Sequence, residues 1–217
     1  MLLTKDDYGL AKMVLDNSGV VAFPTETVMG LGIYFDDHKA YEYLNKIKNR
    51  PEDKPYTLML GNVKDIDQYA YVSEEARKVI NAFMPGPITV LLKVKENVPT
   101  YVTHNTGIIG VRVPAMRDLL KFIQYCEKPL LVPSANKSGE KPAMSSDEVE
   151  SIFGDEVGYV FKGTCSGGVP STIVDLTGEQ VKILREGPIS FDDIKQVLMR
   201  GNWYENCCRL WPWWSWI

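Results

Sequence analysis

Residues 23–32 read FPTETVMGLG, and residues 48–55, one predicted helix later, read KNRPEDKP. The first segment is the end of an apolar strand, which Pro24 stops before a turn rich in hydroxyl groups. The second segment carries three cations, Lys48, Arg50 and Lys54. The proline between them must end the helix. Hydroxyl groups and backbone amides at a strand end, facing fixed cations, are what binding a phosphorylated small molecule requires.

The composition is that of a globular protein. Its 217 residues are 45% hydrophobic and 24% charged, which predicts one domain with a substantial core. The net charge of −4 argues against a protein whose main role is to coat nucleic acid, although it leaves room for a local basic groove. The four cysteines lack zinc-like spacing, and no export signal or membrane span is visible, so we expect a cytoplasmic protein with reduced thiols.

Helices and strands are predicted to alternate along the chain without a clear linker. Apolar spacing and capping residues indicate helices over 6–17, 39–49, 73–83, 117–125, 146–153 and 190–199. Runs rich in Val and Ile indicate strands over 20–23, 56–60, 88–94, 108–113 and 129–132, and a hairpin formed by STIVDL (171–176) and VKILRE (181–186). We therefore predict a single α/β domain of mixed α+β character over residues 1–200, with helices flanking a twisted sheet of parallel and antiparallel strands.

Apolar spacing also predicts which helix faces are buried, and glycine predicts a turn. The first helix would bury Leu10, Met13 and Val14, with Asp7 or Tyr8 on the same spacing, and the second would bury Ala40, Tyr43, Leu44 and Ile47. Gly30 and Gly32, which follow the hydroxyl-rich segment, are expected to allow a tight turn.

Common catalytic motifs are absent from the sequence. No phosphate-binding P-loop, dinucleotide fingerprint, zinc-protease helix or nucleophile elbow is found. The two histidines, His38 and His104, lie beside loop signals and are expected at the surface. Two histidines are few for a catalytic triad or a histidine-rich metal site. The sequence therefore favours catalysis in which the protein orients its substrates and neutralises their charge. Phosphoryl and nucleotidyl transfer rest mainly on these two effects.

Further polar residues follow the predicted strands, and each admits a plain structural alternative. The loop PSANKSGEKPA places Ser134 and Asn136 directly after a strand, where ligands are often bound but turns are common as well. Ser171 opens one strand of the hairpin. Arg185 closes the other strand, where it either grips a phosphate or pairs with Glu186. Likewise, the PTET hydroxyls fit a capped helix start as well as a ligand site, and the KNRPEDK cations fit a solvated helix face.

Seven motifs, taken in order, resemble one family. Between about Val20 and Gly187 the chain carries FPTETVMGLG, KNRPEDKP, MPGPITVLL, GVRVPA, VPSANKSG, STIVDL and ILREG. In this order they are similar to the YrdC-like threonylcarbamoyl-AMP synthases, in their short single-domain form. The resemblance implies a YrdC-like fold with a concave ligand groove. It also implies a nucleotidyltransferase that converts L-threonine, bicarbonate or CO2, and ATP into threonylcarbamoyl-adenylate and pyrophosphate, for partner proteins that modify tRNA next to the anticodon.

The resemblance also implies residue roles. L-threonine would contact Thr25, Thr27, Met59, Arg112 and Ser171. Arg112 suits the carboxylate because its guanidinium can bond both oxygens at once. ATP, with magnesium, would contact Lys48, Arg50, Lys54, Ser134, Asn136 and Arg185. Catalysis would need no covalent intermediate, and Lys48, Arg50 and Arg185 would stabilise the charge that develops on the departing pyrophosphate.

The chain departs from the family pattern at Met29 and at Tyr56 to Met59, and its YTLM string is similar to the YciO-like paralogues. Two alternatives therefore stay open. The first is a protein that binds double-stranded RNA or tRNA without synthase activity, through a basic surface made by Lys46, Lys48, Arg50, Lys54, Lys137 and Lys141. The second is a carbamoyl-adenylate-forming domain similar to that of hydrogenase maturation, which normally sits in much longer chains.

The C-terminal segment, residues 201–217, differs in composition from the rest of the chain. All five tryptophans lie between Trp203 and Trp216. Tryptophan favours membrane interfaces, but the segment contains Pro212 and is too short to span a bilayer. An irregular extension and an apolar patch that docks on the domain or on a partner are both compatible with this composition, so no role is assigned to it.

Overall fold

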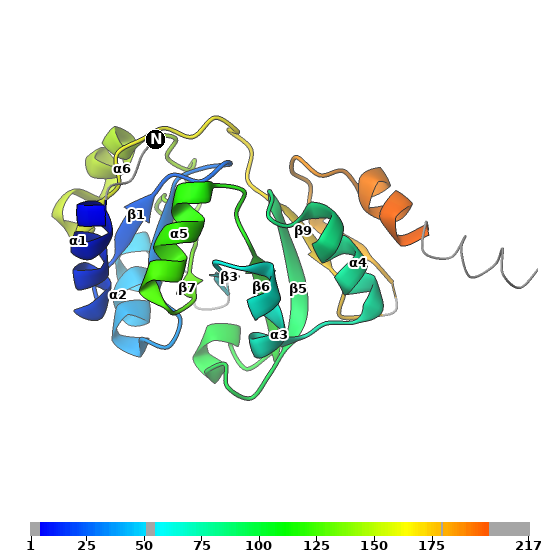
Figure 1. Cartoon of the computed structure of the whole chain (residues 1–217). Coiled ribbons are helices and arrows are strands. Elements are labelled where there is room, and N and C mark those ends of the chain that lie inside the picture. The colour runs from blue at the N-terminus through cyan, green and yellow to red at the C-terminus, as the bar shows by residue number, and fades with distance from the viewer. Residues whose placement is uncertain (1–4, 51–54, 179, 200–217) are drawn as a thin grey trace, which may run out of the picture.

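The computed structural model describes residues 5–50, 55–178 and 180–199 (Figure 1). Its helices are α1 (Lys5–Asp16), α2 (His38–Lys48), α3 (Ile66–Tyr69), α4 (Glu74–Phe83), α5 (Arg117–Cys126), α6 (Ser146–Phe153) and a further helix over 191–199. Short 3₁₀ turns are η1 (Val63–Asp65), η2 (Thr100–Thr103) and η3 (Gly154–Glu156). The six helices expected from the sequence are confirmed, and the single turn of α3 is an addition. The segment 201–217 lies outside the described residues.

One mixed sheet runs through the described part of the chain. Its strands are β1 (Val21–Phe23), β2 (Gly30–Tyr34), β3 (Thr57–Met59), β4 (Ala70–Tyr71), β5 (Ile88–Val94), β6 (Ile108–Arg112), β7 (Leu130–Leu131), β8 (Tyr159–Val160), β9 (Thr172–Asp175) and β10 (Lys182–Arg185). The order is β10-β9-β5-β6-β3-β7-β2-β1-β8, with β4 beside β5. The pairs β1·β8, β3·β6 and β5·β9 are parallel and the others antiparallel. The predicted mixed sheet and the β9–β10 hairpin are confirmed.

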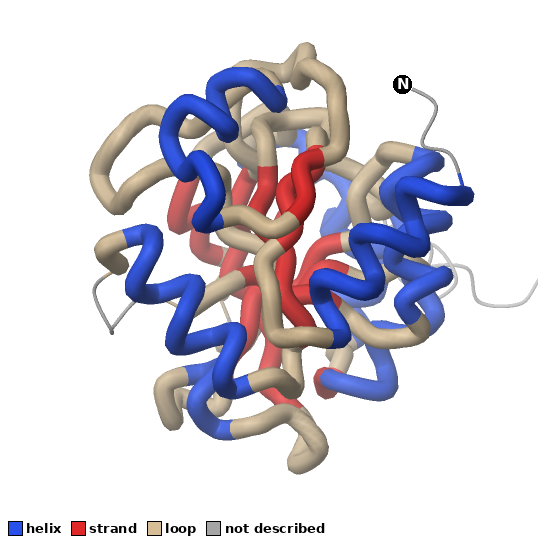
Figure 2. Tube along the Cα trace, turned by 90° about the vertical axis from the view of Figure 1, so that its left-hand side faces the viewer, coloured by secondary structure: helices blue, strands red, loops and turns tan. Residues whose placement is uncertain are grey.

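Helices pack on both sides of the strands (Figure 2). Side chains of α1 and α5 form one apolar cluster with alternate residues of β1, β3 and β7, such as Phe23, Met59 and Leu130. Side chains of α2, α4 and α6 form the larger cluster with the opposite residues, such as Ala22, Leu58 and Leu131. Because successive strand residues point to opposite faces, each strand contributes to both cores. The strand ends are therefore held rigidly from both sides.

Two capping residues fix where α2 begins and ends. The Asp37 carboxylate accepts a hydrogen bond from the Ala40 amide at 3.0 Å, which satisfies a free donor of the first turn. At the other end Asn49 adopts the left-handed conformation, with φ 49°, and stops the helix. The helix therefore ends before Arg50.

The buried face predicted for α2 is confirmed except at Tyr43, whereas in α1 two of the predicted residues are exposed. Leu10 and Met13 are 49% and 56% exposed, whereas Tyr8, Ala11 and Leu15 are buried. Tyr8 turns inward because its ring packs against Phe122 and Phe161 and its hydroxyl donates to a backbone carbonyl of α5.

In α2 the buried tyrosine is Tyr41, which packs against Tyr56 and Tyr101. Tyr43 is instead exposed. The other predicted residues, Ala40, Leu44 and Ile47, are buried. Apolar spacing therefore predicted the buried face of α2, and only the choice between its two tyrosines was wrong.

The tight turn expected at Gly30 and Gly32 is also wrong, because both glycines lie inside β2, which pairs with β1. A Cβ at Gly32 would stand 2.6 Å from the Phe23 ring, and a Cβ at Gly30 would stand 2.8 Å from Val132. The glycines therefore make room for a buried ring and for the start of the loop that follows β7. The turn itself is formed by the hydroxyl-rich residues before them.

The histidines and cysteines of the described residues lie in ordinary structural settings. His38 is exposed, and His104 is partly buried against the hydroxyl of Tyr41. Cys126 and Cys165 are free thiols. Within the described ranges, no helix is both long and apolar enough to cross a membrane.

Candidate functional site

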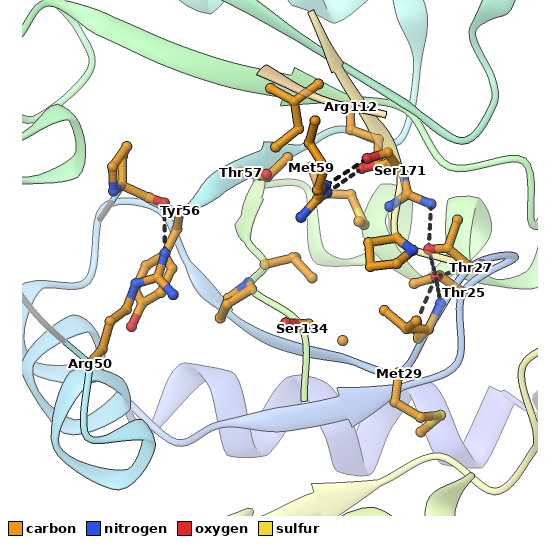
Figure 3. A pocket seen from close by; sticks show the side chains of 18 residues that line it. Thr25, Thr27, Met29, Arg50, Tyr56, Thr57, Met59, Arg112, Ser134 and Ser171 are labelled. Carbon is orange, nitrogen blue, oxygen red and sulfur yellow. Dashed lines mark hydrogen bonds between the residues drawn. The ribbon is translucent and has the colours of Figure 1, made fainter. Parts of the chain in front are cut away.

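A pocket of about 190 Å³ lies where several strand ends and loops meet. Its walls come from the β1–β2 turn, β3, the end of β6, the loop after β7, the start of β9 and the end of β10. Eight of the residues expected to bind substrates line it: Thr25, Thr27, Arg50, Met59, Arg112, Ser134, Ser171 and Arg185. In Figure 3, Arg50 lies at one end of this pocket, and Thr25 and Thr27 lie at the other.

The turn between β1 and β2 is built on threonine hydroxyls. Thr25 Oγ1 donates to the Val28 carbonyl at 2.7 Å and accepts from the Thr27 amide at 3.1 Å. Thr27 Oγ1 lies 2.9 Å from Thr25 Oγ1, and both residues are buried. A hydroxyl that bonds the backbone two or three residues ahead stabilises a turn that has no regular ladder. The hydroxyl-rich turn expected after β1 is therefore confirmed, and a helix start is not formed.

Arg112, the last residue of β6, crosses the floor of the pocket toward this turn. Its Nη2 donates to Thr27 Oγ1 at 3.1 Å and pairs with Glu26 Oε1 at 2.9 Å. Glu26 Oε1 also accepts from the Ala115 amide at 3.1 Å. Among the described residues, Arg112 Nε and Glu26 Oε2 are buried without a hydrogen-bond partner. Nη2 is therefore engaged inside the protein, and the two-pronged contact with a carboxylate expected from the sequence stays a prediction.

Glu26 is a residue of the site that the sequence reasoning missed. The sequence feature that points to it is its position between the two threonines of PTET, in the predicted hydroxyl-rich turn. A buried guanidinium requires a carboxylate or several acceptors close by, and Glu26 supplies that charge.

Arg185 closes the opposite wall. Its Nε donates to the Ser171 carbonyl at 3.0 Å and its Nη2 donates to Ser171 Oγ at 3.2 Å. Of the two interpretations offered by the sequence, the ion pair with Glu186 is not formed. Burial, and secondarily the charge of Arg112, lowers the pKa of Arg185 from its ordinary value. Arg112 is buried and Arg185 is exposed at the rim, and two guanidinium groups lining one cavity make it a favourable place for an anion.

At the far end of the pocket, Arg50 lies flat on an aromatic ring. Its guanidinium carbon is 4.5 Å from the centre of the Tyr56 ring, and its Nη2 donates to the Pro55 carbonyl at 3.0 Å. The Tyr56 hydroxyl donates to Asn45 Oδ1 at 2.5 Å, and burial raises the pKa of Tyr56. Tyr56 is a second missed residue. The sequence signal for it was an aromatic residue two positions after Lys54, with Pro55 between them.

Lys48 and Asn136 do not line the pocket. Lys48 is 1% exposed, and its ammonium donates to the carbonyls of Ser134 and Asn136, each at 2.6 Å. The Asn136 amide donates to the carbonyls of Lys137 and Glu140 and accepts from Ser134 Oγ. Both side chains thus hold the loop after β7 against α2, and it is the start of that loop, Val132, Pro133 and Ser134, that lines the pocket. Lys54 lies outside the described residues.

Burial, followed by the charges of Arg50 and Lys137, lowers the pKa of Lys48 to about 7. Lys137 itself donates to the Ile47 carbonyl and to Glu156, each at 2.7 Å. Two of the six cations of the alternative RNA-binding surface are therefore bound to acceptors of this chain, Lys48 in the interior and Lys137 near the surface. Lys46 and Lys141 remain exposed.

Comparison with known sequences then assigns the chain to a family. The profile of the Sua5–YciO–YrdC family, described as telomere recombination, matches residues 13–187. The chain belongs to this family. The match covers every element that lines the pocket, so the resemblance seen in the seven ordered motifs is confirmed.

Named members of the Sua5–YciO–YrdC family are similar over most of this chain. The threonylcarbamoyl-AMP synthase of Pyrococcus abyssi is 35% identical over 181 residues, which are 82% of this chain and 53% of the relative. A putative threonylcarbamoyl-AMP synthase of Methanocaldococcus jannaschii is 33% identical over 181 residues, which are 83% of this chain and 84% of the relative. The chain spans about half the length of the Pyrococcus relative.

A solved structure agrees with the fold of this family member. The crystal structure of Pyrococcus abyssi Sua5 complexed with L-threonine matches with a TM-score of 0.87 and 32% identity. The match covers 91% of this chain and 58% of that one. The predicted YrdC-like fold is therefore confirmed, including the sheet that carries the pocket.

Proposed function

We propose that this protein is an L-threonylcarbamoyladenylate synthase, which joins L-threonine, CO2 from bicarbonate, and ATP to give threonylcarbamoyl-AMP and pyrophosphate. The observation that carries the proposal is one pocket with a polar end, made by Thr27, Arg112 and Ser171, and a second end that carries Arg50. An amino acid has a carboxylate and an amine for the first end, and a nucleotide has phosphates for the second. The likeness to a Sua5 structure complexed with L-threonine supports the same assignment.

In the proposed reaction, the chain's own residues bind and orient. Arg112 and Ser171 hold the amino-acid carboxylate, while Thr27 faces the amine or hydroxyl. The amine nitrogen forms a bond to the carbon of CO2 and loses a proton, which gives a carbamate. A carbamate oxygen then attacks the α-phosphorus of ATP while the bond to the bridging oxygen breaks and pyrophosphate leaves. No bond to the protein forms at any step.

Arg185 and Arg50 are proposed to neutralise the charge that grows on the departing pyrophosphate. Both are positioned before any ligand arrives, Arg185 by Ser171 and Arg50 by Tyr56. Cations fixed in advance, in a cavity with restricted water, stabilise developing charge more than mobile surface cations do. Lys48, Ser134 and Asn136 would contribute by fixing the loop that carries the nucleotide side of the pocket.

Magnesium is proposed to enter with ATP. Among the described residues, no group of three or more His, Cys, Asp or Glu side chains could hold a metal ion. The pocket offers cations and hydroxyls, so magnesium would be held by phosphate oxygens, its usual ligands in nucleotide sites. No step of the mechanism above is assigned to a protein-bound metal.

We further propose that partner proteins take threonylcarbamoyl-AMP and attach its threonylcarbamoyl group to the adenosine next to the anticodon of tRNA, in the cytoplasm. Direct RNA binding is the less supported function, because Lys48 and Lys137 of the suggested basic surface are bound to internal acceptors. Such binding would still be recognised by a steep loss of affinity with salt.

Pyrophosphate release tests the proposed reaction. Release is expected only when L-threonine, bicarbonate and ATP are all present. Arg185→Gln should lower its rate at least tenfold, because a cation that Ser171 holds in the pocket wall beside the reacting phosphates is lost. The surface variant Arg77→Gln, which breaks only an exposed pair with Asp67, should stay within about twofold of wild type. Release that continues without threonine or without bicarbonate would contradict the proposal.

A further inference from the structure

Thr89 lies on β5 in the MPGPITVLL motif, just behind the pocket wall, and it has no role in the site described so far. The residue is 2% exposed, and its Oγ1 is 2.9 Å from Ser171 Oγ. Its methyl group packs on the neighbouring strand, since a Cβ at Gly110 would stand 2.8 Å from Thr89 Cγ2. The rotamer of Thr89 is thereby fixed, with the hydroxyl aimed at Ser171.

The direction of the Thr89–Ser171 hydrogen bond follows from counting donors and acceptors. A buried hydroxyl must donate its hydrogen somewhere, and in the described part of the chain Ser171 Oγ is the partner of Thr89 Oγ1. Ser171 Oγ therefore accepts from Thr89 and also from Arg185 Nη2 at 3.2 Å. These two bonds use both of its lone pairs, so the hydrogen of Ser171 is left to point into the pocket.

The opposite polarity holds at Thr27. Thr25 Oγ1 donates to the Val28 carbonyl at 2.7 Å and accepts from the Thr27 and Val28 amides at 3.1 and 3.3 Å. Since its own hydrogen is used, the hydrogen in its 2.9 Å contact with Thr27 Oγ1 comes from Thr27, which shares these acceptor sites with the amides. Thr27 Oγ1 also accepts from Arg112 at 3.1 Å. One lone pair of Thr27 remains, and it can only accept. Figure 3 shows Ser171 and Thr27 on neighbouring walls of the same pocket.

We propose that Thr89 is a positioning residue that fixes the Ser171 hydroxyl as a hydrogen-bond donor toward the carboxylate of the bound amino acid. This inference rests on the proposed function, because it takes L-threonine as the ligand. Ser171 offers a donor and Thr27 an acceptor, so an amino acid is bound with its carboxylate at Ser171 and an N–H or O–H group at Thr27. A ligand turned the other way would place like groups together at both hydroxyls.

Calorimetric titration with L-threonine, and separately with ATP, tests this role in four forms of the protein: wild type, Thr89→Val, Thr89→Ser and Ser171→Ala. Thr89→Val keeps the shape of the side chain but removes the hydroxyl, and it should weaken L-threonine binding about fivefold. Ser171→Ala removes the donor itself and should weaken binding tenfold or more. Thr89→Ser restores the hydroxyl and should bind within about twofold of wild type.

The double variant Thr89→Val/Ser171→Ala shows whether Thr89 acts through Ser171. It should bind L-threonine no more weakly than Ser171→Ala alone, and ATP binding and the thermal unfolding midpoint should be unchanged in Thr89→Val. The inference is overturned if Thr89→Val binds L-threonine as wild type does, or if it weakens ATP binding equally. It is also overturned if the two substitutions add independently. Failure of the wild type to bind L-threonine would instead overturn the proposed function, and this inference with it.

Discussion

Three cations, Lys48, Arg112 and Arg185, each have a specific polar partner, and the first two are buried. Arg112 has Glu26, Arg185 has Ser171, and Lys48 has two backbone carbonyls. An unpaired buried charge is costly, so the partners of Lys48 and Arg112 are a condition of folding as well as of ligand binding. The sequence showed the cations but not their burial, because Lys48 and the Ser134 carbonyl are 86 positions apart and meet only through the fold.

Lys48 makes the stability of the protein depend on pH. Burial lowers its pKa to about 7 from the ordinary value of 10.5, so between these values the unfolded chain binds more protons than the folded one. The free energy of unfolding of wild type relative to Lys48→Met should therefore rise as pH increases from 7 to 9, by up to about 1.4 kcal/mol per pH unit. Urea denaturation of both proteins across this range measures it. A free-energy difference that stays constant or falls with rising pH would show that folding does not lower the pKa of Lys48.

At the scale of elements, the β1–β2 pair determines the shape of the threonine-rich turn. The apolar strand β1 was predictable from its Val and Phe content, whereas β2 was missed because its GLG start has low strand propensity. Its glycines are required by a contact with Phe23, a residue on the neighbouring strand, and no local pattern encodes such a contact. The same limit applied to α1, where the choice of buried stripe depended on rings that belong to α5.

Gly32→Ala tests this packing directly. Its new Cβ would stand 2.6 Å from the Phe23 ring, so the ring or the strand must shift, and the variant should lose about 1–3 kcal/mol of unfolding free energy. Gly9→Ala is the matched control, because a Cβ at Gly9 in α1 meets no atom within 4 Å. That variant should gain about 0.5–1 kcal/mol from improved helix propensity. Denaturant titration measures the free energy of unfolding of both variants. Equal changes in the two would mean that β2 tolerates a side chain at residue 32.

At the scale of the whole molecule, the order of short motifs along the chain predicted the family and the mixed sheet. Strand order could not be read in the same way, since β5 pairs with β9 and β3 with β7 across long stretches of sequence. These long-range pairings place PTET, GVRVPA, PSTIVD and ILREG around one cavity. Only the folded structure shows that Arg50 and Ser134 line this cavity, whereas Lys48 and Asn136 lie behind it and hold its loop in place.

The central claim is that this cavity makes threonylcarbamoyl-AMP. Mass spectrometry of a reaction containing L-threonine, ATP and 13C-labelled bicarbonate measures the product itself. The account predicts an adenylate that contains threonine and carries the label in its carbamoyl carbon, formed together with pyrophosphate. Conversion of ATP to ADP or AMP without any labelled threonylcarbamoyl-adenylate would contradict it.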